Sequence, residues 1–103
     1  MNDTFFKDIK NEIEKEEKLT REEFATIIFK YIEKYNINIP AVLMLYPPYD
    51  DEAQISDDAK IAVDQMRYTG LMQAKKENMF KPKSKVTKKE LAAVFKKLKD
   101  LID

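Results

Sequence analysis

Five carboxylates gather in one short stretch of this sequence and are the first side chains to consider for chemistry: Asp50, Asp51, Glu52, Asp57 and Asp58. Paired carboxylates can act as general acid and base, and carboxylate oxygens are the ligands that calcium prefers. The stretch lacks the D-x-[DN]-x-[DN]-G spacing of a calcium loop. We therefore interpret these residues as helix-capping and solvated carboxylates.

The chain of 103 residues contains no cysteine and no histidine. This composition excludes disulfides and thiolate metal sites, and it removes the usual general base and zinc ligand. We therefore predict a non-catalytic protein with no metal site and no cofactor.

Lysines are the other concentrated charge. Ten lysines and two glutamates lie between Lys75 and Lys99. Residues 1–52 carry a net charge of −5 and residues 53–103 a net charge of +5, although the whole chain is neutral. Such a surface favours an anionic partner through long-range attraction, and a lysine-rich solvated face is the alternative.

Nucleic acid is not the expected partner. The chain has two arginines, Arg21 and Arg67, and few aromatic residues, among them Tyr68 and Phe80, lie near the lysines. Base reading and base stacking depend on such side chains.

Two segments begin helices in the same way: "LTREEFATIIF" from Leu19 and "VTKKELAAVF" from Val86. Each contains a capping box, formed by Thr20 with Glu23 and by Thr87 with Glu90, and an apolar residue precedes each threonine as a hydrophobic staple. The apolar faces also match at the same offsets: Phe24, Ile27, Ile28, Tyr31 and Tyr35 correspond to Leu91, Val94, Phe95, Leu98 and Ile102. We predict helices from Thr20 to about Tyr35 and from Thr87 onward, arising either from chance similarity or from an internal repeat.

Three further helices are expected. The first runs from about Phe5 to Glu17 with Phe6, Ile9 and Ile13 inward. A short helix carries the run Ala41 to Tyr46 between Pro40 and Pro47-Pro48, and most of the apolar residues 42–45 should be buried against a neighbouring helix or a partner. The third is N-capped by Ser56, presents Ala59, Ala62, Val63 and Met66 on one face, and ends at Gly70 in the left-handed conformation.

Leu71, Met72 and Phe80 should fold back on the core from the lysine-rich connector. The chain has one glycine and four prolines, which leaves few turns for β-hairpins. We therefore predict a single all-α domain, a small bundle of about four to five helices.

The order of these parts resembles a known family. Tyr49-Asp50-Asp51, the helix ending in "MRYTGLM" and the segment "NMFKPKSKVTKKELAAVFKKL" are similar to the F-x-D start, glycine turn, F-x-P loop and T-R-A-E helix of an S-layer homology repeat. The resemblance covers residues 49–98 as a full repeat. Phe6-Lys7-Asp8 followed by "LTREEFATIIF" resembles a shortened copy over residues 6–35. The resulting organisation is a shortened repeat at 1–38, an apolar connector at 39–48 and a full repeat at 49–103.

The resemblance implies a helical module that, in sets of three, binds anionic and often pyruvylated cell-wall polysaccharide and anchors bacterial surface proteins. It also implies candidate ligand-binding residues. Arg21 and Lys88 match the arginine of T-R-A-E, Asp51 and Asp8 match the aspartate of F-x-D, and Gly70 matches the turn glycine. An arginine can grip a carboxylate with two hydrogen bonds, whereas a lysine supplies a point charge.

The sequence departs from the family pattern in three ways. The "KKENMF" loop lacks the usual glycines, there is no tryptophan to stack on a sugar, and a third repeat is missing. Two functions follow. The first is wall attachment through an anionic polysaccharide, and the alternative is a degenerate module for protein interaction or assembly, including homo-oligomers.

The N-terminal residues carry charges and lack the apolar core of a signal peptide, and no transmembrane run is present. We expect no membrane insertion. The location is extracellular, at the cell wall of a bacterium, if the chain is a mature or excised piece, and cytoplasmic if the chain is complete.

Overall fold

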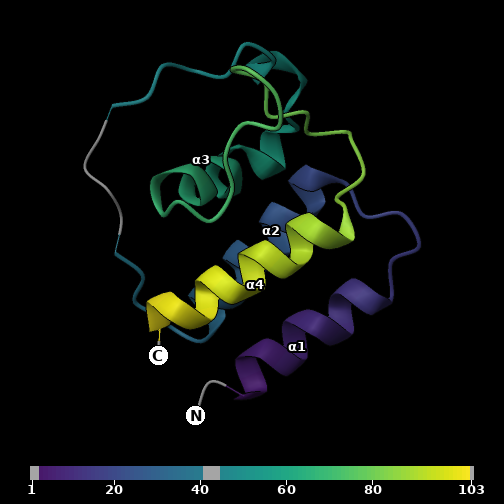
Figure 1. Cartoon of the computed structure of the whole chain (residues 1–103), viewed down its shortest axis with the longest axis vertical. Helices are drawn as coiled ribbons and strands as arrows, with labels where there is room; N and C mark the ends of the chain where they lie inside the picture. The colour runs from purple at the N-terminus through teal and green to yellow at the C-terminus, as the bar shows by residue number, and fades with distance from the viewer. Residues whose placement is uncertain (1–2, 41–44, 103) are drawn as a thin grey trace.

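The computed structural model describes residues 3–40 and 45–102, and Figure 1 shows their arrangement. Over these residues the fold is all-α with no strand, which confirms the predicted class. The elements are α1 (Asp3–Glu14), α2 (Arg21–Lys34), the short 3₁₀ turns η1 (Glu52–Gln54) and η2 (Asp57–Ala59), α3 (Lys60–Tyr68) and α4 (Lys88–Ile102).

Both predicted capping boxes are present. The backbone N–H of Thr20 donates to Glu23 Oε1 over 2.9 Å, and the Glu23 N–H donates back to Thr20 Oγ1. Thr87 and Glu90 repeat this exchange with distances of 2.8 and 3.1 Å. The boxes satisfy backbone donors that the first turn of a helix leaves free.

The two helix starts lie against each other. Thr20 forms an antiparallel bridge with Lys85, and the Val86 N–H donates to the Leu19 carbonyl over 2.8 Å. From this junction α2 and α4 run in a similar direction, with α4 in front of α2 in Figure 1. The matching sequence segments therefore meet in space at the point where both helices begin.

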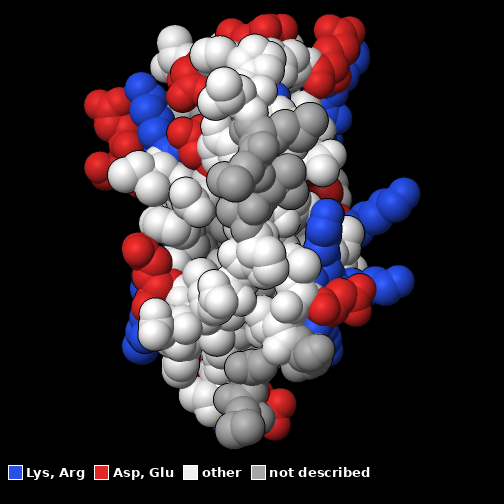
Figure 2. Space-filling view, turned by 90° about the vertical axis from the view of Figure 1, so that its left-hand side faces the viewer, with Lys and Arg blue, Asp and Glu red and all other residues white. Residues whose placement is uncertain are grey.

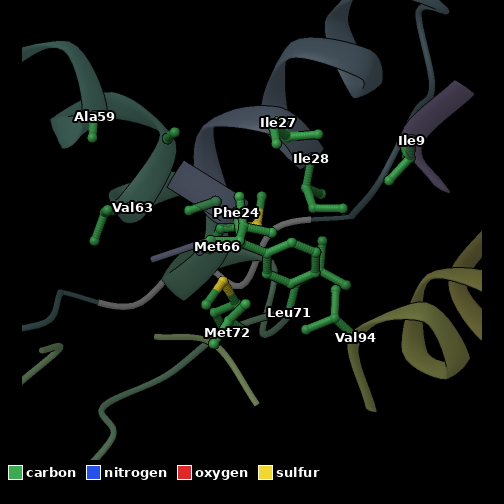
Figure 3. Close-up of a cluster of buried hydrophobic side chains, with 14 of the residues drawn as sticks. Ile9, Phe24, Ile27, Ile28, Ala59, Val63, Met66, Leu71, Met72 and Val94 are labelled. Atoms are coloured by element: carbon green, nitrogen blue, oxygen red, sulfur yellow. The ribbon is translucent and has the colours of Figure 1, made fainter. Parts of the chain in front are cut away.

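Helix α2 is central to the core. It packs against α1 and α3, and Phe24 and Phe95 join it to α4 with ring centroids 6.5 Å apart. Figure 3 shows Phe24 of α2 beside Met66 of α3 at the centre of the cluster, with Val63 of α3 on one side and Val94 of α4 on the other. The apolar faces predicted for α2 and α4 point inward: Phe24, Ile27, Ile28, Tyr31, Val94 and Leu98 are buried, and Tyr35, Leu91, Phe95 and Ile102 are partly buried.

Other predicted core residues are also confirmed. Ala59, Ala62, Val63 and Met66 are buried on one side of α3, and Leu71, Met72 and Phe80 are buried as the connector folds back. Gly70 has a φ of 77°, the left-handed conformation expected after α3.

The first helix differs from its prediction in position and in face. It covers Asp3–Glu14 rather than about 5–17, because a tighter turn from Glu12 to Lys15 ends it within a charged stretch. Phe5 is buried whereas Phe6 is partly buried. Phe5 packs edge-on against Tyr35 of α2, with ring centroids 5.9 Å apart.

The predicted helix over Ala41 to Tyr46 is wrong where it can be examined. Ala41–Met44 lie outside the described residues, Leu45 and Tyr46 are not helical, and Leu45 is 97% exposed rather than buried. The prolines at 47 and 48 favour extended backbone in the residues before them.

Ser56 does not cap a helix with its side chain, contrary to the prediction. Its hydroxyl instead donates to Glu22 Oε2 over 2.7 Å. The segment after Ser56 begins as the 3₁₀ turn η2 and becomes α-helical at Lys60.

Candidate functional site

Arg21, the strongest sequence candidate, is a buried residue at the start of α2. Its Nε donates to the Phe80 carbonyl over 2.8 Å and its Nη2 donates to the Gln73 carbonyl over 2.6 Å. Its Nη1 pairs with Glu90 of α4. The guanidinium also lies over the Phe80 ring, 4.6 Å from the centroid. Arg21 therefore joins α2, the 73–80 loop and α4.

Asp51 holds the same loop from the other side. Its carboxylate accepts the Phe80 N–H over 3.0 Å and the Lys81 N–H over 2.8 Å, and its side chain is buried. Arg21 and Asp51 thus bind opposite ends of residue Phe80, one at the carbonyl and one at the amide. The structure brings these two predicted residues together, and their hydrogen bonds position the 73–80 loop.

Gly70 lies beside the Lys97 side chain of α4. A Cβ at this position would be 3.0 Å from Lys97 Nζ and 3.6 Å from Lys97 Cε. The turn after α3 therefore allows the Lys97 side chain to approach its backbone closely, in addition to needing a left-handed residue.

Lys88 and Asp8 lie elsewhere. Lys88 is exposed in the first turn of α4 and lines a groove of about 410 Å³ with the end of α1, opposite Glu16 and Glu17. Asp8 of α1 accepts a hydrogen bond from the Tyr35 hydroxyl of α2. The five predicted residues therefore do not converge on one site, and their role in ligand binding stays a prediction.

A second groove, of about 320 Å³, borders Arg21. Its walls are the 71–75 loop and the α4 residues Glu90, Ala93 and Val94. One carboxylate oxygen of Glu90 forms an ion pair with Arg21. The other oxygen forms an ion pair with Lys75 Nζ, over 3.3 Å. Burial opposes the ionisation of Glu90, but the Thr87 N–H, Arg21 and Lys75 outweigh it and lower the pKa of Glu90. The groove thus contains two cations and one ionised carboxylate.

Sequence reasoning missed a buried carboxylate beside this site. Glu22 accepts the Ser56 N–H over 2.9 Å, the Ser56 hydroxyl and Lys83 Nζ over 2.6 Å. Burial raises the pKa of Glu22, and these hydrogen bonds more than offset that effect and lower it below the ordinary value. No local pattern signals this network, because its partners are separated by 34 and 61 residues.

The lysines of the last third of the chain face solvent. Nine of the ten between Lys75 and Lys99 are exposed, and Lys81 is partly buried. Two of them, Lys75 and Lys83, form ion pairs with Glu90 and Glu22. Over residues 3–40 and 45–102, the other eight form no ion pair.

The acidic stretch at 50–58 is dispersed. Asp50, Asp57 and Asp58 are exposed and Asp51 is buried in its own hydrogen bonds. Within the described part of the chain, no cluster of three or more carboxylates is arranged to hold a metal ion. In the same part, no helix combines the length and the apolar character needed to cross a membrane.

The family comparison agrees with the resemblance seen in the sequence. Residues 48–92 match the family model of the S-layer homology domain, which confirms the prediction over this segment. Domains of this family in general attach proteins at the cell surface and bind cell-wall polysaccharide, so the match over residues 48–92 indicates a cell-surface anchoring context in general. Neither a curated protein nor a solved structure matches the chain significantly.

Proposed function

We propose that this chain anchors a bacterial surface protein by binding an anionic cell-wall polysaccharide. The observation that carries the proposal is the exposed lysine surface between Lys75 and Lys99, which overlaps the segment that matches the family. Eight of these lysines have no ion pair over the described ranges. Unpaired surface cations attract a polyanion over a long range, and salt weakens that attraction.

The groove beside Arg21 suits the polymer best. Lys75 is 37% exposed at its side chain, and its 3.3 Å contact with Glu90 is open to exchange with an anion. Arg21 is 5% exposed and has three protein partners. Arg21, Asp51 and Gly70 would therefore shape the loop, while Lys75 and Lys97 meet the ligand.

Lys88 and Asp8 have separate places in this proposal. Lys88 would add charge from the neighbouring groove at the start of α4. Asp8 would act through its bond to Tyr35, by fixing α1 on α2.

The repeat organisation is part of the same proposal. We propose that residues 1–38 are a shortened copy, 39–48 a connector and 49–103 the full repeat. The equivalent capping boxes and the bridge between Thr20 and Lys85 support this reading.

Binding to purified Gram-positive wall sacculi tests the function. Retention should fall with increasing salt, and it should vanish after the secondary polysaccharide is removed. Lys75→Glu should weaken retention because it reverses a charge that lines the groove, and Lys97→Glu should do so because it reverses an exposed charge beside Gly70. Lys10→Glu is the matched control, since it reverses an exposed charge on α1.

Arg21→Ala is a poor probe of binding, because its loss would also disturb the fold. Equal retention with and without the polymer, or no retention at low salt, would contradict the proposal.

A second function is favoured by a specific observation, the exposure of apolar side chains. Leu45 is 97% exposed and Ile61 is 67% exposed. In the view of Figure 2, white uncharged residues occupy much of the described surface away from its edges, and charged residues lie toward the edges. We propose that these exposed apolar side chains take part in a protein interface, since exposed apolar patches can mark such sites. Light scattering should detect a homo-oligomer that Leu45→Asp dissociates, and a concentration-independent monomer would contradict self-assembly.

A further inference from the structure

The second arginine, Arg67, lies at the end of α3 against two tyrosine rings. Its guanidinium carbon is 4.0 Å from the ring centroid of Tyr49 and 4.6 Å from that of Tyr46. Its Nη1 donates to the Pro47 carbonyl over 2.7 Å, and its Nη2 donates to Asn78 Oδ1 over 3.2 Å. The guanidinium is thus held in one orientation before any ligand arrives.

Arg67 differs from Arg21 in its charge balance. Arg21 is paired with Glu90, whereas Arg67 has no ion pair with any carboxylate of the described ranges. A guanidinium has five N–H donors. Among the described residues, Arg67 uses two of them, in its hydrogen bonds to Pro47 and Asn78. Arg67 is also only partly buried. It therefore keeps both charge and donors for a further partner.

A pocket of about 360 Å³ opens beside this arginine, within the range of about 300–1,000 Å³ typical of small-molecule sites. Besides Arg67 it is lined by Tyr46, Gln73, Ala74, Glu77 and Asn78. The lining combines one aromatic ring with three planar polar side chains, those of Gln73, Glu77 and Asn78. Hydroxyl groups of a sugar can bond with such amides and carboxylates, and the aromatic ring can contact its apolar face.

We propose that this pocket, here called the Arg67 pocket, binds an acidic sugar residue, whose carboxylate pairs with Arg67 while its hydroxyls bond with Gln73 and Glu77. An arginine fork matches a carboxylate with two parallel hydrogen bonds. The kind of ligand rests on the proposed function, but the Arg67 pocket is separate from the groove beside Arg21. The two sites lie on either side of residues Gln73 and Ala74, which line both.

The carboxylates around Arg67 set the expected selectivity. Glu77 lines the pocket and is exposed, and Asp50 accepts a hydrogen bond from the Asn78 amide over 3.1 Å. Burial raises the pKa of Tyr49, Arg67 and Arg21 oppose that effect, and Asp64 adds a smaller effect that raises it. These carboxylates oppose a simple inorganic anion, so binding should require the hydroxyls of a sugar as well as its carboxylate.

Amide NMR shifts during titration with methyl β-D-glucuronide test the assignment, with methyl β-D-glucoside as the uncharged control. The glucuronide should move the amides of Gln73, Ala74, Glu77 and Asn78, and the glucoside should bind more weakly. Arg67→Gln should weaken glucuronide binding about tenfold or more. Glu77→Gln should strengthen it about two- to threefold by removing a like charge, which a purely structural role would not do.

Tyr46→Leu provides a second variant if Arg67→Gln fails to fold, and it should also weaken glucuronide binding. The proposal is overturned if these amides do not move, if the glucoside binds equally well, or if folded Arg67→Gln binds the glucuronide like the unchanged chain. Sacculus retention without glucuronide binding would overturn the Arg67 pocket and leave wall attachment standing. Glucuronide binding without sacculus retention would support the pocket and reject wall attachment.

Discussion

Replacing Arg21 by alanine should destabilise the fold more than any exchange of an exposed charge. The substitution removes the donors to the Phe80 and Gln73 carbonyls and the cation paired with Glu90. Loss of one partner of a buried ion pair typically costs about 3–5 kcal/mol. Glu90 is 20% exposed and keeps Lys75 at 3.3 Å, so we expect a value near the lower end, about 3 kcal/mol.

Two further variants calibrate this value. Lys75→Ala removes the exposed partner of the same carboxylate and should cost less than about 1 kcal/mol. Arg21→Lys keeps the charge but cannot reach three acceptors at once, so its cost should lie between those of the two alanine variants.

Urea unfolding followed by the helical circular dichroism signal measures these differences. With a slope of about 1–3 kcal/mol per molar urea, a loss of 3 kcal/mol lowers the midpoint by about 1–3 M. A shift for Arg21→Ala no larger than that for Lys75→Ala would refute the reasoning, because the buried hydrogen bonds would then contribute nothing net.

Three other outcomes are expected. Gly70→Ala should lower the free energy of unfolding by about 1–2 kcal/mol, since the φ of 77° is left-handed. Thermal unfolding should show the same cost in a Lys97→Ala background, because backbone strain and not the contact with Lys97 causes it; a smaller cost there would contradict this reason. Tyr49→Phe should be neutral or stabilising by up to about 1 kcal/mol, because no described residue bonds to the buried Tyr49 hydroxyl; clear destabilisation would reveal a partner. The lowered pKa of Glu22 stabilises the fold above the unfolded-state pKa of about 4.3, and this stability is lost as the pH falls through the lower folded-state pKa. Glu22→Gln should therefore flatten the decline of the urea midpoint in acid, and an unchanged decline would contradict the assigned network.

The features that were predictable from sequence depend on neighbours within one or two helical turns. The capping boxes at Thr20 and Thr87, and the left-handed turn at Gly70, follow from residue types at short spacing. The apolar faces of α2 and α4 follow from the helical period. The family resemblance could be recognised for the same reason, since its motifs are local.

Positions that depend on another element were less predictable. Phe5 and Phe6 are adjacent, and contact with Tyr35 decides that Phe5 is the buried one. Ser56 has the residue type and position of an N-cap, but its hydroxyl donates to Glu22 Oε2 and its oxygen accepts from Lys83 Nζ instead of from a helix N–H. The local rule failed there because it cannot include a carboxylate 34 residues away.

The sequence by itself determined the helical class, the equivalent helix starts and the lysine-rich surface, because these arise from composition and short-range spacing. Only the tertiary structure decided which charges are free. It placed Arg21 inside the protein with Glu90, 69 residues distant, and left Arg67 against two tyrosines at the edge of a polar pocket. The two arginines have the same chemistry, and the burial and partners that distinguish them exist only once distant segments have packed together.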